Sequence, residues 1–188
     1  DGEVIVSVGE EYKAHRIILG PIRELWTKET FEWLTSCGAD VHACDDYALV
    51  WAAGNGNLEV TKLLLEYRAD VHADDDYALC WASSNGHVDV VKLLLESGAN
   101  VHARADYALR FASGKGHLEV VRLLLESGAN IHACDDYALC WASTSGHLDV
   151  VKFLVEFGAN IHADNDHALH WASKNGQVEV VEYLKSLY

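Results

Sequence analysis

The sequence lacks methionine altogether, and it has only one proline and no Cys-x-x-Cys pair among its 188 residues. Because residue 1 is not Met, we expect the chain to be a fragment or a processed form of a longer protein. The five cysteines are an odd number without the spacing of a disulfide framework, which indicates a reducing, intracellular compartment such as the cytoplasm. No apolar run approaches the roughly 18 residues of a membrane-spanning helix, so we expect no membrane insertion.

Basic residues are also scarce. Lys and Arg together number 14 against 29 Asp and Glu, and the formal net charge is −15. Such a field repels phosphate backbones and anionic lipids, which argues against nucleic acid or a membrane surface as the partner and favours a basic or mixed one. Half of the residues are hydrophobic, so the chain is not a disordered acidic tail.

The dominant feature that is present is a repeat with a period of 30 residues, which is the sequence signature of a repeat architecture. One register holds Tyr47, Tyr77, Tyr107, Tyr137 and His167. A second register holds Trp51, Trp81, Phe111, Trp141 and Trp171. A third holds Gly56, Gly86, Gly116, Gly146 and Gly176, and a fourth holds His42, His72, His102, His132 and His162.

The sequence of each unit predicts two helices separated by a glycine. The first helix covers D-Y-A-L-x-W-A-S, in which Leu79 and Ala82 form part of an inward-facing stripe. The second covers a segment such as G-H-V-D-V-V-K-L-L-L-E, with acidic residues in its first turn. The residues that we predict to cap the first helices are Asp46, Asp76, Asp106, Asp136 and Asp166.

A two-helix unit of this size cannot bury its apolar stripe alone, whereas stacked units can. The stretch Y-A-L-C-W-A-S-S-N-G-H-V-D-V-V-K-L-L-L-E-S-G-A-N-V-H-A at residues 77–103 resembles the ankyrin repeat pattern, and the resemblance extends over residues 24–188. We therefore expect an all-α ankyrin-repeat solenoid of stacked helix-turn-helix units. The expected divisions are a partial unit at 24–44, full units at 45–74, 75–104, 105–134 and 135–164, and a C-terminal unit at 165–188.

Two departures from the family pattern matter. The period is three residues shorter than the family's usual 33, and the missing residues fall at the β-turn finger, so we expect shortened fingers. Residues 1–20 resemble the opening of a BTB/POZ domain in V-I-V-S-V-G and A-H-R-I-I-L, and we interpret residues 1–23 as a short N-terminal cap or a BTB-like remnant. The wording Y-A-L-x-W-A-S is similar to the ankyrin sets of giant DNA viruses, which would place the protein in host-cell cytoplasm.

The sequence contains no Gly-rich phosphate loop, no nucleophile–base pair and no clustered metal ligands, so it predicts a protein that is not an enzyme and needs no cofactor or metal. The ankyrin resemblance implies a monomeric module that binds a partner protein in its concave groove. The alternative is a substrate-recognition adaptor of a cullin-type ubiquitin ligase, if the BTB-like residues belong to a larger parent domain.

The repeated aromatic residues allow two interpretations. Tyr77 and Trp81 are four residues apart, so they share one helix face that lies away from Leu79. These rings could line the groove as interface anchors. Alternatively, they could stack from unit to unit, because they recur in nearly every unit whereas the surface of a partner is seldom periodic. The aromatic candidates for partner binding are Trp81, Tyr107, Phe111 and Trp141.

Residues that differ between units are the better indicators of specific binding. The third full unit, with the arginine that precedes it, carries Arg104, Arg110 and Lys115 where its neighbours are acidic or neutral, and Arg122 where they carry lysine. The pattern is either surface drift or a basic, partly aromatic patch that pairs with an anionic group of a partner. Arg104, Arg110 and Lys115 are therefore candidate partner-binding residues.

Histidines and cysteines supply the remaining candidates. In ankyrin repeats the place of His72, His102, His132 and His162 is usually an Asn that an asparaginyl hydroxylase modifies, which makes these histidines candidates for the same modification; otherwise they are hydrogen-bonded turn residues. His167 and His170 are the best available metal pair, although the sequence predicts no metal site. Cys80 and Cys140 lie near Asp rather than near a positive group, so we interpret them as small packing residues and not as nucleophiles.

Overall fold

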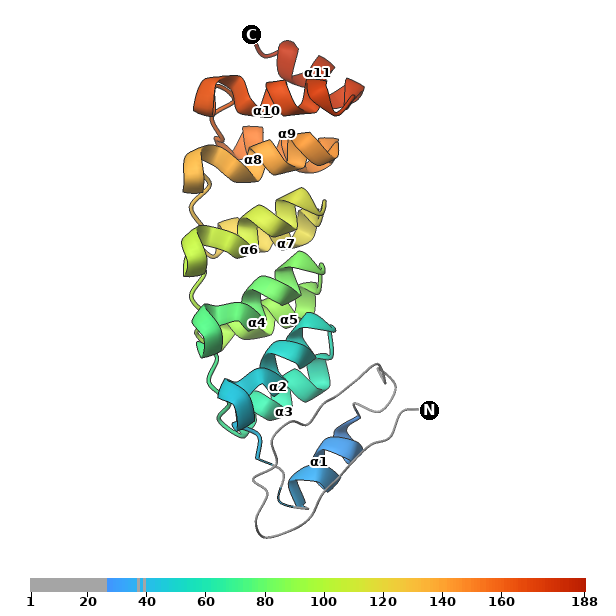
Figure 1. Cartoon of the computed structure of the whole chain (residues 1–188), viewed down its shortest axis with the longest axis vertical. Coiled ribbons are helices and arrows are strands. Elements are labelled where there is room, and N and C mark those ends of the chain that lie inside the picture. The colour runs from blue at the N-terminus through green and yellow to red at the C-terminus, as the bar shows by residue number, and fades with distance from the viewer. Residues whose placement is uncertain (1–26, 37, 39) are drawn as a thin grey trace.

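The computed structural model describes residues 27–36, 38 and 40–188, and this part of the chain contains eleven α-helices and no β-strand. The helices follow one another along a single elongated stack, with α1 at one end and α11 at the other (Figure 1). The predicted all-α solenoid is therefore confirmed. The predicted cap and the BTB-like segment lie outside the described residues.

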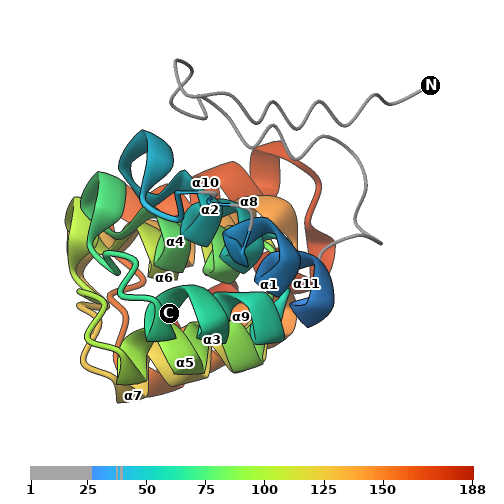
Figure 2. The same ribbon diagram turned by 90° about the horizontal axis from the view of Figure 1, so that it is seen from below.

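The stack has two layers, which are clearest when it is viewed along its length (Figure 2). The inner layer consists of α2 Ala43–Gly54, α4 Ala73–Ser84, α6 Ala103–Gly114, α8 Ala133–Ser145 and α10 Ala163–Lys174. The outer layer consists of α1 Lys28–Ser36, α3 Leu58–Glu66, α5 Val88–Glu96, α7 Leu118–Glu126, α9 Leu148–Phe157 and α11 Val178–Lys185. Each unit after the partial first one contributes one helix to each layer, as its two-helix pattern predicts.

The core lies between the two layers and repeats with the sequence. The inner helices α2, α4, α6 and α8 each bury one leucine in the register of Leu79, and the outer helices from α3 to α11 each bury one in the register of Leu94; all these side chains are at most 1% exposed. Complete burial of a leucine contributes about 1.5–3 kcal/mol, so stability accumulates unit by unit. The stripe that contains Leu79 and Ala82 faces this core, because residues three and four apart share a helix face.

The turn that enters each inner helix differs from the prediction. The N-capping role predicted for Asp76 and its equivalents is wrong, because Asp76 has φ 58° and not the extended conformation of an N-cap. Its buried Oδ1 atom accepts hydrogen bonds from His72 Nδ1 at 3.1 Å and from the backbone N–H of Asn100 at 2.7 Å. The aspartate therefore fastens the turn at the start of α4 to the loop between α5 and α6 instead of capping its own helix.

Three consecutive residues in each of these turns have a left-handed backbone. In α4 they are Asp74, Asp75 and Asp76, with φ of 49°, 51° and 58°. Such residues cost roughly 1–2 kcal/mol each, and a short Asp or Asn side chain is disfavoured least. This compact turn occupies the place of the finger in the shorter repeat, and no strand forms there in the described part of the chain.

Candidate functional site

Aromatic side chains form pairs along the inner layer, on the face away from the outer helices. The rings of Tyr107 and Phe111 stack at 3.9 Å between centroids, and those of Tyr137 and Trp141 lie 5.2 Å apart. These pairs join residues four apart on the same helix, and their members are half-buried. The face is therefore apolar and partly open to solvent.

Contact between units is more limited than a continuous stack of rings. Among the described residues, Phe111 and Trp141 form the one pair of these inner-helix rings that crosses between units, edge to face at 4.5 Å. Trp81 instead packs on Gly54 of the preceding unit, where any side chain larger than Gly would collide with the indole ring. Trp81 and Trp141 are thus anchored on the preceding unit while part of each ring stays exposed.

The structure shows that Arg104 connects two units. Its Nη2 atom donates to the carboxylate of Asp74 at 2.6 Å and to the backbone carbonyl of the same residue at 2.7 Å. Its guanidinium also lies over the ring of Tyr77, 4.8 Å from the centroid. Arg104 is therefore neutralised and held within the protein.

The other two basic candidates differ in their surroundings. Arg110 donates from Nε to the carbonyl of Ala105 and from Nη2 to the carbonyl of Arg104, and it lies 5.5 Å from the ring centroid of Tyr107. Lys115 follows the end of α6 and is exposed. Arg110 keeps its charge without a carboxylate partner in the described residues, so Arg110 and Lys115 carry the positive charge of the predicted patch.

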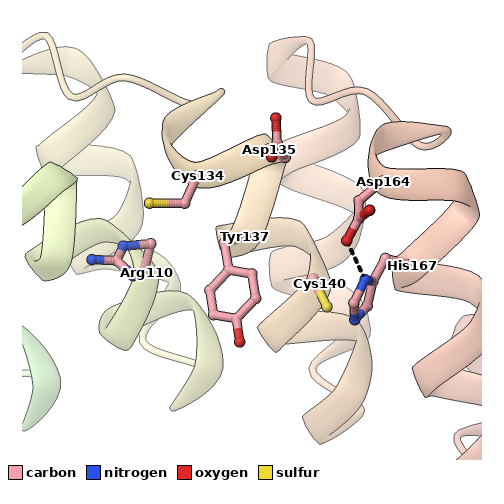
Figure 3. A pocket seen from close by; sticks show the side chains of 7 residues that line it. All are labelled: Arg110, Cys134, Asp135, Tyr137, Cys140, Asp164 and His167. Atoms are coloured by element: carbon pink, nitrogen blue, oxygen red, sulfur yellow. Dashed lines mark hydrogen bonds and ion pairs between the residues drawn. The ribbon is translucent and has the colours of Figure 1, made fainter.

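A cleft of about 280 Å³ opens where α6, α8 and α10 meet (Figure 3). Arg110 and Cys134 lie on one side of Tyr137, whereas Cys140, Asp164 and His167 lie on the other. Its full lining is Arg110, Cys134, Asp135, Tyr137, Cys140, Asp164 and His167. The cleft thus combines an aromatic ring with charges of both signs, a combination that sequence reasoning missed because these residues come from three units.

The buried cysteines are poor nucleophiles in this environment. Burial raises the pKa of the Cys80 thiol to about 11, and Asp76 acts in the same direction. Burial also raises the pKa of Cys140. A thiol with a raised pKa stays protonated at neutral pH, and only the thiolate attacks an electrophile. Both residues serve as small side chains in the packing of the inner layer.

The histidines at the turns belong to a repeated hydrogen-bond chain. In each full unit the ring Nδ1 donates to the aspartate four residues later, as His102 does to Asp106 at 3.1 Å. The side chain of His102 is 56% exposed while that of Asp106 is 6% exposed. The histidine ring is thus fixed at one nitrogen and open at its outer edge. Hydroxylation of His72, His102, His132 and His162 stays a prediction.

Asp166, the equivalent of Asp76 in α10, is bound by a tyrosine. The Oη atom of Tyr188 donates to Asp166 Oδ1 at 2.6 Å, and its ring meets His162 edge to face. The hydrogen bond raises the pKa of Tyr188 to about 12 and lowers that of Asp166. The C-terminal tyrosine therefore completes the same network by a different group.

A second row of histidines was not singled out from the sequence. His87 Nε2 donates to the carbonyl of Gly54, and His117 Nε2 donates to the carbonyl of Ser84, each in the preceding unit. Burial lowers the pKa of His117, which keeps its ring neutral. The recurring Gly-His pair was the available signal, because the glycine before each histidine leaves room for the ring of the next unit.

Neither a metal centre nor a membrane span is indicated by the residues that the structure describes. They contain no group of three or more His, Cys, Asp or Glu side chains placed to hold a metal ion. His167 is engaged with Asp164 through Nδ1 at 2.6 Å, and His170 lies edge-on to Trp171. None of the described helices has the length and apolar character needed to cross a lipid bilayer.

Comparison with known proteins identifies the family. A model of ankyrin repeats in three copies matches residues 26–105 and 108–187. An ankyrin repeat protein of Acanthamoeba polyphaga mimivirus is 42% identical over 60 residues, which cover 32% of this chain and 29% of that protein. A second from the same virus is 41% identical over 58 residues, which cover 31% of this chain and 18% of the relative. The matched segments thus span less than a third of either relative. The predicted ankyrin repeat and its likeness to giant-virus proteins are both confirmed. This chain belongs to the ankyrin repeat family.

Proposed function

We propose that the chain is a non-enzymatic module that binds a partner protein across its inner-helix face, the concave groove of the ankyrin resemblance. Ankyrin repeats are in general protein–protein interaction modules. The observation that carries the proposal here is the row of half-exposed aromatic pairs on the inner helices, bordered by charges that change from unit to unit. Residues that are constant provide contact area, and residues that vary provide specificity.

The aromatic residues supply the affinity in this proposal. Large, partly exposed Trp and Tyr side chains are the commonest energetic anchors of interfaces, especially where the surrounding structure fixes them. Trp81, Tyr107, Phe111 and Trp141 meet this condition, because neighbouring rings or the preceding unit hold each of them in place. Little side-chain freedom is then lost when a partner covers them.

The positive charges supply orientation. Arg110 and Lys115 lie in the third full unit of a chain whose net charge is −15, so an anionic group of the partner has one favourable position along the stack. Arg104 contributes indirectly, because its charge is already balanced by Asp74. It fixes the spacing of two neighbouring units of the proposed binding face.

The test is capture of partner proteins from extracts of the cells that produce the protein, measured by quantitative mass spectrometry. Arg110→Glu combined with Lys115→Glu is expected to reduce capture of the specific partner at least about tenfold, which corresponds to about 1.4 kcal/mol. The matched control is Lys62→Glu combined with Lys92→Glu, which makes the same charge change on the outer helices α3 and α5. Equal capture by both variants would refute binding through the inner face.

Three finer expectations stay predictions. The ligase-adaptor alternative depends on residues 1–20, outside the described part of the chain, and would require a full BTB domain in the parent protein that binds a cullin. A cytoplasmic location in the host cell would be tested by microscopy of the tagged protein. A monomeric state would be tested by light scattering.

A further inference from the structure

We propose that the cleft around Tyr137 accepts an arginine side chain of the partner, with the guanidinium over the tyrosine ring and between Asp135 and Asp164. The inference deepens the proposed function, on which it rests for the existence of a partner. The partner segment is therefore cationic at the position that meets the fourth full unit.

The protein itself provides the precedent for this arrangement. Arg104 lies over the ring of Tyr77, 4.8 Å from its centroid, and is held by the carboxylate of Asp74 at 2.6 Å. Cation–π attraction and a charge-assisted hydrogen bond act on the same guanidinium. An arginine of α6 is thus bound by a tyrosine and an aspartate of α4, the preceding inner helix.

The surroundings of Tyr137 keep the tyrosine of this arrangement but have neither the arginine nor the aspartate at the position of Asp74. Residues 75–83 and 135–143 are identical, so Tyr137 lies on the same helical surface as Tyr77. The position equivalent to Arg104 is Asp164, and the position equivalent to Asp74 is Cys134. Within the described residues no cationic side chain lies over the Tyr137 ring, whereas Tyr77 and Tyr107 are each covered by an arginine.

Two carboxylates are available to bind the guanidinium. Asp135 is exposed and forms no hydrogen bond or ion pair with the part of the chain that the structure describes. Asp164 is 55% exposed and uses Oδ2 to accept from His167, so its other oxygen remains for a second donor. In Figure 3, Asp164 lies beside His167, to the right of Tyr137, and Asp135 lies above Tyr137.

The remaining lining residues restrict the occupant to one side chain. The cleft volume of about 280 Å³ is slightly below the range of pockets for whole small-molecule ligands. Arg110 lines the opposite side, but its Nε and Nη2 atoms donate to carbonyls of its own unit and it lies over Tyr107. It therefore leaves the Tyr137 ring uncovered, and it directs an incoming cation to the end formed by the aspartates.

The first full unit shows why chemistry alone does not define the site. Cys44, Tyr47 and Asp74 repeat the residue types of Cys134, Tyr137 and Asp164. Asp74, however, is already paired with Arg104, so its carboxylate is not available to bind the guanidinium of a partner. The cleft at Tyr137 differs because neither Asp135 nor Asp164 is paired with an arginine among the described residues.

The probe is N-acetyl-arginine amide, titrated into the isotopically labelled protein while the ring resonances of Tyr137 are followed by NMR. We expect saturable shifts with a Kd near ~1 mM, the weak affinity of a single side chain. N-acetyl-citrulline amide, which has the same shape without the charge, is expected to bind at least about tenfold more weakly. Equal binding of the two compounds, or no shift at Tyr137, would overturn the proposal.

Matched substitutions locate the site. Asp135→Asn combined with Asp164→Asn is expected to weaken probe binding at least about tenfold, and Asn tolerates the left-handed backbone of both positions. Asp75→Asn is the control, because Asp75 has the register of Asp135 in the unit where Arg104 already covers the ring. An equal loss in the control would show general charge attraction and not a site.

A self-occupied variant gives an independent test. Cys134→Asp combined with Asp164→Arg transfers the Asp74–Arg104 pair into the cleft, and position 164 has φ 47° against 52° at Arg104. The new arginine is expected to cover Tyr137 and abolish probe binding while the helical circular dichroism spectrum is unchanged. Retained probe binding in this folded variant would contradict the proposal. Because the probe assay uses no partner, it can succeed when partner capture fails, and the reverse.

Discussion

Residues 75–83 and 135–143 have the same nine-residue sequence and different surroundings. Their cores are alike, since Leu79 and Leu139 are each 1% exposed. Their surfaces differ: Arg104 covers Tyr77, whereas Tyr137 borders an open cleft. The difference comes from the variable residues around the identical stretch, which are Asp74 and Arg104 in the first copy and Cys134 and Asp164 in the second. In this solenoid the repeated residues determine the packing, and the variable residues determine what the surface can bind.

The first prediction tests whether the two copies are equal in their cores. Leu79→Ala and Leu139→Ala are each expected to lower the free energy of unfolding by about 2–5 kcal/mol, because both leave a cavity in a fully buried position. Urea unfolding followed by circular dichroism measures both losses. A difference of more than about 2 kcal/mol would mean that Arg104 and Arg110 stabilise the core as well as the surface.

The second prediction concerns the buried aspartates that join adjacent turns. Asp76→Ala and Asp136→Ala are each expected to cost about 1.5–3 kcal/mol, because the buried carboxylate accepts from a histidine ring and from a backbone N–H of the loop that leads to the next inner helix. Asp75→Ala is the control, since its side chain is exposed and makes no such contact. An equal loss for Asp75→Ala would assign the effect to backbone strain in the left-handed turn.

Much of this fold could be predicted because a 30-residue period indicates a stack of similar structural units. A repeated apolar stripe requires a repeated neighbour, so helix order, layers and core leucines follow from the sequence alone. The role of Asp76 could not be predicted in the same way. An aspartate that caps its own helix and one that binds a more distant loop occupy the same place in the sequence, and only the position of Asn100, 24 residues later, distinguishes them.

The candidate site was predicted only in part, for a related reason. Sequence variation indicated that Arg104 is unusual, but not that Asp74 neutralises it. That contact joins residues in the same register of adjacent units, and reading it requires knowing that stacked units place their turns side by side. The cleft at Tyr137 was missed because it results from the absence of an arginine rather than from a motif.

The third prediction compares the cysteines of the two copies. Because the pKa of Cys80 is raised from 9.0 to about 11, its thiolate fraction at pH 8 is about 100-fold lower than that of an unperturbed thiol. Iodoacetamide labelling, read peptide by peptide by mass spectrometry, is expected to proceed in the order Cys134, Cys140, Cys80. The order follows exposure and pKa together, since Cys134 is exposed and Cys140 is buried with a raised pKa. Labelling of Cys80 as fast as Cys134 in the folded protein would contradict this.

The smallest expected effect on stability tests the comparison most directly. Arg104→Gln removes a partly exposed ion pair with Asp74, which is expected to cost no more than about 1 kcal/mol in urea unfolding. The same change uncovers Tyr77, so the first copy then resembles the second, with Asp74 and Asp75 beside an open ring. N-acetyl-arginine amide should now shift the resonances of Tyr77 as well as those of Tyr137. If the probe shifts only the resonances of Tyr137, binding depends on the particular carboxylates of that cleft, and an identical helix sequence is insufficient to create the site. If it shifts the resonances of both tyrosines, a single arginine is what separates scaffold from binding site in this chain.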